Sequence, residues 1–263
     1  MEESEFIDKK DVGDRFTKER TKRCEDLMNK EAQGYLNLPL DEKIKISQKI
    51  IREAIAKYPN IGLGFSGGTD SLVLLHLVLP IKSDMPTIFV DTQHEFQETY
   101  EFIKKIVKEW NLKDYKAVKA DENKLEEFKQ KFGLKSPEFT TTCCEYHKIA
   151  PMMKAIGEEG YDAFLVGLRG VEHEERAKET FYSPRKNPEH IRIHPLLFWR
   201  QEDVLNYVKR FKIPCNPMYA KGYTSLGCHV CTSKNTDPNA HERAGRGVVR
   251  ETVMPRLREL GYT

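Results

Sequence analysis

The sequence lacks the features that mark membrane, secreted, fibrous and disordered proteins. No apolar run approaches the roughly 18 residues that a membrane-spanning helix needs, and the N-terminal segment MEESEFIDKK has no apolar core of a secretion signal. Internal repeats and low-complexity blocks are also missing. Charged residues make up 32% and hydrophobic residues 39% of the chain, which excludes a disordered tail protein. We therefore expect a cytoplasmic protein with no membrane association.

The chain also has a low net charge and few cysteines. The formal net charge is only +2, so the overall charge gives no argument for a nucleic-acid partner. Six cysteines in 263 residues are too few for a disulfide scaffold. Four of them stand in two close pairs, and in an unsecreted protein such clustering points to metal or redox chemistry.

From Lys45 onward, segments with helical apolar spacing alternate with short apolar runs. This alternation predicts an α/β protein with a doubly wound, mostly parallel sheet covered by helices on both faces. The predicted helices are 45–58, 71–79, 96–110 and about 146–158, and the predicted strands are 61–65, 87–91, 115–120 and 163–167. The chain is divided into a helical N-terminal extension (1–44), the α/β domain (45–213) and a C-terminal segment (214–263) that packs over the sheet edge of the same domain.

A turn with two adjacent glycines follows the first predicted strand. Adjacent glycines let backbone N–H groups point at an anion without obstruction by Cβ atoms, and the next helix adds its free N–H groups and positive dipole end. The turn is not a Walker A loop, because no lysine stands between Lys57 and Lys82. The alternative is a plain strand-to-helix turn. As a phosphate site, the turn would use Ser66, Gly67, Gly68, Thr69, Asp70 and Ser71.

Two arginines follow the last predicted strand, at the end where open α/β sheets bind their ligands. Their guanidinium groups could each hold a phosphate or sulfate through paired hydrogen bonds. The sequence EHEERAKE equally suits a surface helix with Glu–Arg pairs, so residue chemistry leaves both interpretations open for Arg169 and Arg176.

The two cysteine pairs are an adjacent pair, Cys143 and Cys144, and a Cys-x-x-Cys, Cys228 and Cys231. Four thiolates in two pairs can bind one metal centre. From the spacing alone, zinc, an iron–sulfur cluster and a redox disulfide all remain open. Cys24 and Cys215 have no partner in the sequence, and we interpret Cys215 as a buried packing residue and Cys24 as incidental.

Several motifs, in one order over about 48–250, resemble the PP-loop superfamily and, within it, the adenylyl-sulfate and phosphoadenylyl-sulfate reductases. SGGTDS is similar to the loop of PP-loop ATP pyrophosphatases. VDTQHEFQETYEF (90–102), GLRGVEHEERAKE (167–179) and IRIHPLLFWRQEDVLNYV (191–208) resemble further reductase motifs. The resemblance implies the adenine nucleotide alpha-hydrolase-like PP-loop fold, with a nucleotide near Asp91 and Thr92.

The resemblance also favours one role where residue chemistry left several. It implies anion binding by Arg169 and Arg176, and makes them catalytic candidates together with Asp70, which could help to hold Mg²⁺ beside ATP. The cysteine pattern resembles the [4Fe–4S] signature of bacterial adenylyl-sulfate reductases. It implies that the metal ligands are Cys143, Cys144, Cys228 and Cys231.

Two departures from the family pattern limit what the resemblance implies. Gly170 stands where the family has a second consecutive arginine, which removes one positive charge. The segment HERAGRG resembles the reductase C-terminus and implies nucleotide binding by Arg243 and Arg246, yet the catalytic cysteine that follows in the reductases is missing. The chain ends in ELGYT, and a tyrosine cannot replace a thiolate as the nucleophile that attacks the sulfur of sulfate.

Three functions remain from the sequence. The first is an enzyme that binds ATP with Mg²⁺ and adenylates a target, releasing pyrophosphate, before a donor such as a cysteine desulfurase supplies sulfur. Similar enzymes act on tRNA, or on DNA in phosphorothioation systems. The second is an adenylyl-sulfate or phosphoadenylyl-sulfate reductase that makes sulfite with an external, thioredoxin-like thiol. The third is a non-catalytic nucleotide or redox sensor. Arginines near the C-terminus leave a nucleic-acid partner open, and the resemblance implies a homo-oligomer.

Overall fold

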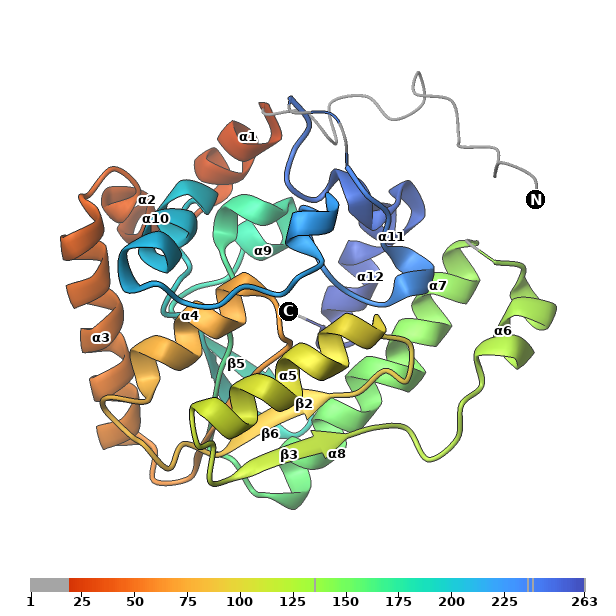
Figure 1. The fold of residues 1–263 in the computed structure, drawn as a ribbon, viewed down its shortest axis with the longest axis horizontal. Helices are drawn as coiled ribbons and strands as arrows, with labels where there is room; N and C mark the ends of the chain where they lie inside the picture. Colours follow the sequence, from red (N-terminus) through yellow and green to blue (C-terminus); the bar gives the residue numbers. More distant parts are fainter. Residues whose placement is uncertain (1–18, 135, 236, 238, 263) are drawn as a thin grey trace.

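The computed structural model describes residues 19–262 except 135, 236 and 238, so the predicted N-terminal extension before residue 19 lies outside the described residues. Six short strands form one sheet in the order β3-β2-β1-β4-β6-β5 (Figure 1). All neighbours pair in parallel except β5 and β6, which form an antiparallel hairpin. The strands are β1 (Ile61–Gly64), β2 (Thr87–Val90), β3 (Tyr115–Val118), β4 (Ala163–Leu165), β5 (Tyr182–Lys186) and β6 (Glu189–Ile193).

Helices connect the parallel strands and cover the sheet, and several start close to the predicted positions. Residues 145–149 form a π-helical turn directly before α8, where the sequence predicts regular helix. No helix of the described part is both long and apolar enough to cross a membrane. The α-helices are α1 (Glu19–Leu27), α2 (Lys30–Tyr35), α3 (Leu40–Lys57), α4 (Thr69–Val78), α5 (Gln97–Glu109), α6 (Leu125–Phe132), α7 (Pro137–Cys144), α8 (Ala150–Glu158), α9 (Glu174–Ala177), α10 (Gln201–Phe211), α11 (Val248–Thr252) and α12 (Met254–Glu259).

The strands bury side chains on both faces of the sheet, as the alternation of residues along a strand requires. Leu63 and Phe89 join the large core with α3, α4, α5 and α10. Their neighbours on the opposite face, such as Ile88 and Phe164, pack with Ile156 of α8 in a second core. The predicted doubly wound α/β fold with helices on both faces is therefore confirmed.

Ion pairs hold the described part of the N-terminal extension against the rest of the protein. The buried Arg20 of α1 contacts Glu251 at 2.9 Å and Glu174 at 2.8 Å, so α1 bridges to α9 and α11. Lys43 of α3 donates to Asp203 of α10 at 2.5 Å. Each pair joins residues more than 150 positions apart, and so it fixes the extension against the rest of the domain.

The C-terminal segment takes a different place from the one predicted. Its helices α11 and α12 pack on α7, and α12 also packs on α9. Its segment 224–227 and its arginines line a pocket at the carboxyl ends of β1, β2 and β4. The segment thus covers the ends of the central strands rather than an edge of the sheet, because its buried Met254 and Leu257 find their apolar partners beside α7 and α8.

Candidate active site

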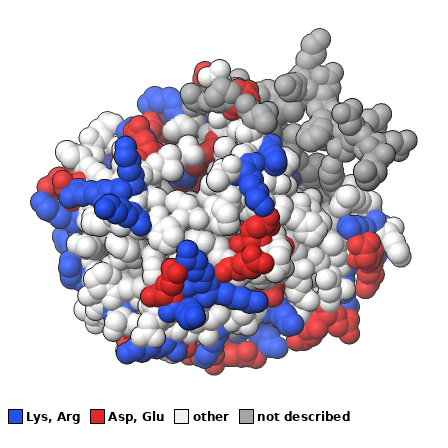
Figure 2. Space-filling model, viewed as in Figure 1, with Lys and Arg blue, Asp and Glu red and all other residues white. Residues whose placement is uncertain are grey.

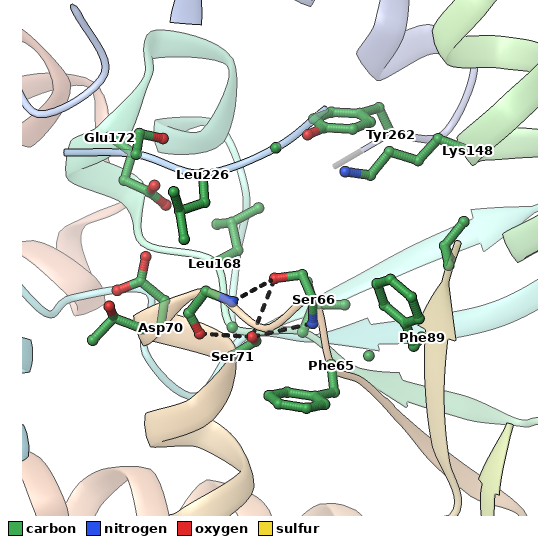
Figure 3. A pocket seen from close by; sticks show the side chains of 18 of the residues that line it. Phe65, Ser66, Asp70, Ser71, Phe89, Lys148, Leu168, Glu172, Leu226 and Tyr262 are labelled. Atoms are coloured by element: carbon green, nitrogen blue, oxygen red, sulfur yellow. Dashed lines mark hydrogen bonds between the residues drawn. The ribbon is translucent and has the colours of Figure 1, made fainter. Parts of the chain in front are cut away.

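The glycine turn lies at the point where the strand order reverses, between β1 and its two neighbours β2 and β4. Ligands of open α/β sheets bind at this point, beyond the carboxyl ends of the strands. A pocket is present there, and Ser66, Asp70 and Ser71 line it on one side (Figure 3). Tyr262 and Lys148 lie together on the opposite side of the pocket.

Neutral hydroxyl groups accept the hydrogen bonds of the backbone N–H groups of this turn. The N–H of Ser66 donates to Oγ of Ser71 (3.2 Å), and the N–H of Gly68 donates to Oγ of Ser66 (3.4 Å). The N–H of Thr69, in the first turn of α4, donates to the hydroxyl of Tyr219 (3.1 Å). These donors therefore face hydroxyls and no carboxylate, so an incoming phosphate could take over the bonds.

Gly67 gives the turn its shape. Its φ of +73° lies in the left-handed region, and a Cβ atom there would stand 2.9 Å from Cγ1 of Ile103 in α5. We expect Gly67→Ala to destabilise the protein by about 1–3 kcal/mol and to weaken nucleotide binding, because both strain and contact distort the turn. Urea unfolding and nucleotide titration measure the two effects.

Gly34 in α2 provides the matched control for this prediction. A Cβ atom at Gly34 would meet nothing within 4 Å, so Gly34→Ala should be neutral or slightly stabilising in a helix. Equal unfolding midpoints for the two variants would show that the turn does not need glycine at Gly67.

A buried ion-pair network stands directly behind the turn. Nε of Arg169 donates to Oδ1 of Asp70 (2.9 Å), and its Nη2 donates to Oε2 of Glu242 (2.6 Å). The Arg169 side chain is only 2% exposed. Burial raises the pKa of Asp70 to about 6, against the opposing effect of the Arg169 charge. Arg169 therefore joins the turn after β1 to the C-terminal segment.

A second carboxylate, Glu172, holds two further arginines. It contacts Nη1 of Arg176, four residues later in the chain, and lies 3.8 Å from Nη1 of Arg243. Arg243 also donates to Glu251 at 2.8 Å. Despite burial, the charges of Arg176, Arg169 and Arg243 lower the pKa of Glu172 to about 2, so this carboxylate is ionised at neutral pH. Both Arg176 and Arg243 line the pocket with their charge partly balanced.

Three other basic side chains line the pocket and form no ion pair with a carboxylate within the described residues: Lys148, Arg192 and Arg246. Arg246 is buried, and its Nε and Nη1 atoms have no hydrogen-bond partner among these residues. A Cβ atom at Gly227 would stand 2.1 Å from Nη1 of Arg246, so a larger residue there would displace the guanidinium group. Buried cations without counter-charge are costly, and an anion in the pocket would offset that cost.

The pocket gathers most, but not all, of the predicted phosphate-binding residues. Arg169, Gly67, Asp91 and Thr92 do not line it: Arg169 lies behind Asp70, Gly67 faces α5, and Oδ1 of Asp91 accepts hydrogen bonds from Gln93 and Tyr100. The predicted residues that line the pocket are Ser66, Gly68, Thr69, Asp70, Ser71, Arg176, Arg243 and Arg246.

Several pocket residues were not predicted. Lys148 carries the clearest signal that could have found it, because it follows Cys144 by four residues and so shares its side of a helix. Arg192 stands in β6, and burial lowers its pKa to about 9. Tyr219 accepts from the turn, and Tyr262 comes from the chain end.

The four predicted metal ligands lie in one region, next to the pocket. All six cysteines are free thiols. Burial, together with the neighbouring Cys144 and Cys231, raises the pKa of Cys143 to about 12. Cys228 and Cys231 interact electrostatically in turn, so each of the four thiols lies close to another of the set.

Polar groups surround these thiols. Cys228 donates to Oγ1 of Thr92 at 3.2 Å, which links the loop 228–231 to the residues after β2. His147 accepts from the N–H of Lys124 through Nε2 (3.2 Å), so its Nδ1 carries the proton, which faces the carbonyl oxygen (3.3 Å) and Sγ (3.6 Å) of Cys143. The histidine is thus a donor toward Cys143.

The described residues contain no group of three or more His, Cys, Asp or Glu side chains that could hold one metal ion. A mononuclear zinc site needs four ligands converging on a single ion, whereas each corner iron of a [4Fe–4S] cluster takes only one cysteine. Basic groups accompany the thiols: burial raises the pKa of Cys231, and Arg250, Arg246 and Lys148 oppose that shift. Basic groups beside four free thiols would offset the negative charge of a thiolate-bound metal centre, whether a zinc ion or an iron–sulfur cluster.

Comparison with known proteins adds an independent view of the chain. The sequence profile of the phosphoadenosine phosphosulfate reductase domain matches residues 60–234. An adenosine 5'-phosphosulfate reductase of Geobacillus sp. (strain WCH70) is 33% identical over 220 residues, which cover 83% of this chain and 92% of the relative. The adenosine 5'-phosphosulfate reductase of Staphylococcus epidermidis (strain ATCC 35984) is 32% identical, covering 80% and 85%.

A solved structure gives the same picture at the level of the fold. The phosphoadenylyl-sulfate reductase of Candida auris, in a phosphate complex, superposes with a TM-score of 0.58 at 25% sequence identity. The match covers 72% of this chain and 94% of that one. The similarity therefore covers most of this chain and nearly the whole of the Candida auris protein.

Proposed function

The chain belongs to the phosphoadenosine phosphosulfate reductase family, and from this membership we propose that its pocket binds ATP and transfers the adenylyl group to an acceptor before sulfur enters. One observation carries the proposal. A single pocket combines the N–H and hydroxyl groups of the turn with the cations Lys148, Arg192 and Arg246, and no cysteine is among the described residues that line it. The pocket thus offers sites for a phosphate chain but no thiol nucleophile.

The lining also suits the base of a nucleotide. Ile88, Val90, Val166 and Leu168 give the pocket an apolar wall next to its charged groups. Nucleotide pockets combine such a wall for the base with a few placed polar groups. We propose that the phosphates lie between the turn and the arginines.

The residues present also define the chemistry of adenylyl transfer. An acceptor oxygen attacks the α-phosphorus, the bond to the β-phosphate breaks, and pyrophosphate leaves. The turn N–H groups and the cations stabilise the charge that develops on the phosphate oxygens. The adenylated oxygen is then a good leaving group, which sulfur from a donor protein can displace together with AMP.

Magnesium is compatible with this arrangement through Asp70. Mg²⁺ is usually held by one or two carboxylates plus phosphate oxygens and water. Asp70 lines the pocket beside the turn, and its oxygens keep lone pairs beyond those that accept from Arg169. A bound Mg²⁺ would neutralise phosphate charge and help pyrophosphate to leave.

We also propose that Cys143, Cys144, Cys228 and Cys231 hold a [4Fe–4S] cluster. The support is the set of four free, electrostatically coupled thiols, with His147 directed at Cys143 and with Lys148 and two arginines nearby. When bound, such a cluster supplies redox chemistry and a concentrated negative charge. Lys148 both lines the pocket and acts on Cys231, so it would stand between the two sites.

The acceptor is not identified by the surface. On the face shown in Figure 2, basic and acidic side chains are interspersed, and no broad basic band crosses its described part. A nucleic-acid acceptor would need such a band or local arginines at the pocket mouth. The first acceptors to supply in the assay are tRNA and DNA.

A second function has a specific observation in its favour. The similar curated proteins are named adenosine 5'-phosphosulfate reductases and are 33% and 32% identical over most of this chain. In that function, adenylyl sulfate would bind in the pocket, and an external dithiol would attack its sulfur to give sulfite, AMP and a disulfide. The external thiol is needed because no cysteine lines the pocket within the described residues.

One assay separates the two functions. The anaerobically purified protein with Mg²⁺ is supplied either with ATP and tRNA or DNA, or with adenylyl sulfate and a dithiol. We expect pyrophosphate release in the first mixture and no sulfite in the second. Sulfite formed without ATP consumption, with no pyrophosphate from any acceptor, would replace the proposed function by the reductase function.

A further inference from the structure

The last turn of the chain is built to place Tyr262. Helix α12 ends in a Schellman motif, in which the N–H of Gly261 donates to the carbonyl of Arg258 (2.9 Å) and the N–H of Tyr262 to that of Leu257 (2.9 Å). Gly261 has a φ of +93°, and a Cβ atom there would stand 2.9 Å from Cε of Met153. The turn therefore requires glycine and packs tightly on α8.

Helix α12, which carries this turn, is held in place by buried apolar contacts. Met254 and Leu257 are fully buried in a small apolar core with Ile149 and Val253, and Leu260 packs against the same core. The direction in which the chain leaves α12 is thus fixed by buried contacts on α7 and α8. Tyr262 occupies a defined position rather than that of a loose chain end.

This position is the cationic side of the pocket. The ring centroid of Tyr262 lies 5.3 Å from Nζ of Lys148 and 4.5 Å from Cζ of Arg250. Tyr262 lines the pocket together with Arg176 and Arg246 and lies across it from Ser66 and Ser71 (Figure 3). We call this group, made of Lys148, Arg176, Arg246, Arg250 and Tyr262, the cationic end.

The phenol is the group at the cationic end that partly offsets its positive charge. Lys148, Arg246 and Arg250 form no ion pair with a carboxylate within the described residues, and only Arg176 has one, with Glu172. Burial raises the pKa of Tyr262, but the charges of Lys148, Arg250, Arg176 and Arg246 outweigh it and lower the pKa to about 6. A sulfate or phosphate group would seek the same cations, and it would compete with the phenol for that space.

We infer that Tyr262 is a specificity-determining residue, because it occupies the place of a tetrahedral oxyanion at the cationic end. A nucleotide whose second anionic group reaches this end, such as adenylyl sulfate, must displace the phenol. A nucleotide whose phosphates lie in the turn need not. The inference rests on the proposed function only in taking the ligand to be a nucleotide, since a free sulfate ion would meet the same competition.

The test measures binding by isothermal titration to the full-length protein and to Tyr262→Ala and Tyr262→Phe. The ligands are ATP, AMP, adenylyl sulfate and inorganic sulfate. We expect Tyr262→Ala to bind adenylyl sulfate and sulfate about tenfold more tightly and AMP with unchanged affinity. Tyr262→Phe should gain less, because it removes the hydroxyl but keeps the ring over Lys148 and Arg250.

A second variant controls for effects of the Tyr262 substitution that do not depend on the position of the phenol. Gly261→Ala keeps the phenol but disturbs the turn that seats it, and it should shift sulfate affinity in the same direction as Tyr262→Ala. Thermal unfolding of each variant checks that the domain is folded. Unchanged or weaker sulfate and adenylyl sulfate binding by folded Tyr262→Ala overturns the inference.

The sulfate titration keeps the two proposals separate. If neither AMP nor ATP binds the wild-type protein, the proposed nucleotide function fails, while the comparison of sulfate affinities still decides the role of Tyr262. If the nucleotides bind but Tyr262→Ala does not favour sulfate, the pocket function stands and the specificity role of Tyr262 falls.

Discussion

Replacement of Arg169 by methionine is expected to destabilise the protein by about 3–5 kcal/mol and to abolish nucleotide binding. Arg169 is buried and donates to Asp70 and Glu242, with Glu172 at 3.7 Å from its Nη2 atom. Without the guanidinium group of Arg169, the carboxylates of Asp70, Glu172 and Glu242 would share one buried region that has less positive charge. Their repulsion would separate the turn after β1 from the C-terminal segment, and urea unfolding measures the loss.

Two further variants show which property of Arg169 matters. Arg169→Lys keeps the charge but cannot contact Asp70 and Glu242 with a planar fork, so it should recover only part of the stability. Arg256→Ala is the control, because Arg256 pairs with Glu259 at 2.8 Å on the surface, where such pairs contribute about 0–1 kcal/mol. A loss below about 1 kcal/mol for Arg169→Met would show that the network does not join the two segments.

The strands of the central sheet were predictable because their signal is local. Apolar runs of four or five residues flanked by glycine or charged residues predict buried strands, and 87–91 differs from β2 (Thr87–Val90) by one residue. The hairpin of β5 and β6 was not predicted. Its edge strand contains Pro184 and charged side chains, and buried positions of β6 carry His190 and Arg192, so no apolar alternation is visible.

The pairing of charges in the site was not predictable for a different reason. Sequence motifs placed Asp70, Arg169 and Arg176 near a ligand, but they did not indicate that Arg169 would contact Glu242, 73 positions later. Such contacts depend on how the C-terminal segment folds back over the sheet. The pairs of Glu172 with Arg169 and Arg176, three and four residues away, have spacings that the sequence shows.

The position of the C-terminal residues could likewise be predicted only in part from the sequence. A glycine directly after a helix predicts a left-handed C-terminal turn, and Gly261 satisfies this pattern. The sequence does not show which surface the next residue then meets. The folded chain brings Tyr262 to Lys148 and Arg250 and places its phenol in the lining of the pocket.

Serine in place of any one of the four clustered cysteines is expected to remove most of the iron from the protein. If Cys143, Cys144, Cys228 and Cys231 hold a [4Fe–4S] cluster, anaerobically isolated wild-type protein should be brown with about four irons per chain. Each ligand serves a different iron, so the loss of one thiolate weakens the whole cluster. Iron and zinc analysis, together with the visible absorbance, measures the effect.

The chain supplies its own controls for this experiment in the two cysteines outside the cluster. Contrary to the interpretation from the sequence, Cys215 is exposed, and Cys24 of α1 is buried in the main hydrophobic core, away from the four-thiol region. Cys215→Ser and Cys24→Ala should therefore keep the full iron content, although the second leaves a small core cavity. One zinc and no iron per wild-type chain would contradict the cluster, and so would equal iron loss from Cys215→Ser and Cys228→Ser. If the protein held no metal and its free thiols were lost two at a time on oxidation, the four cysteines would instead form redox-active disulfides. Disulfide formation consumes thiols in pairs.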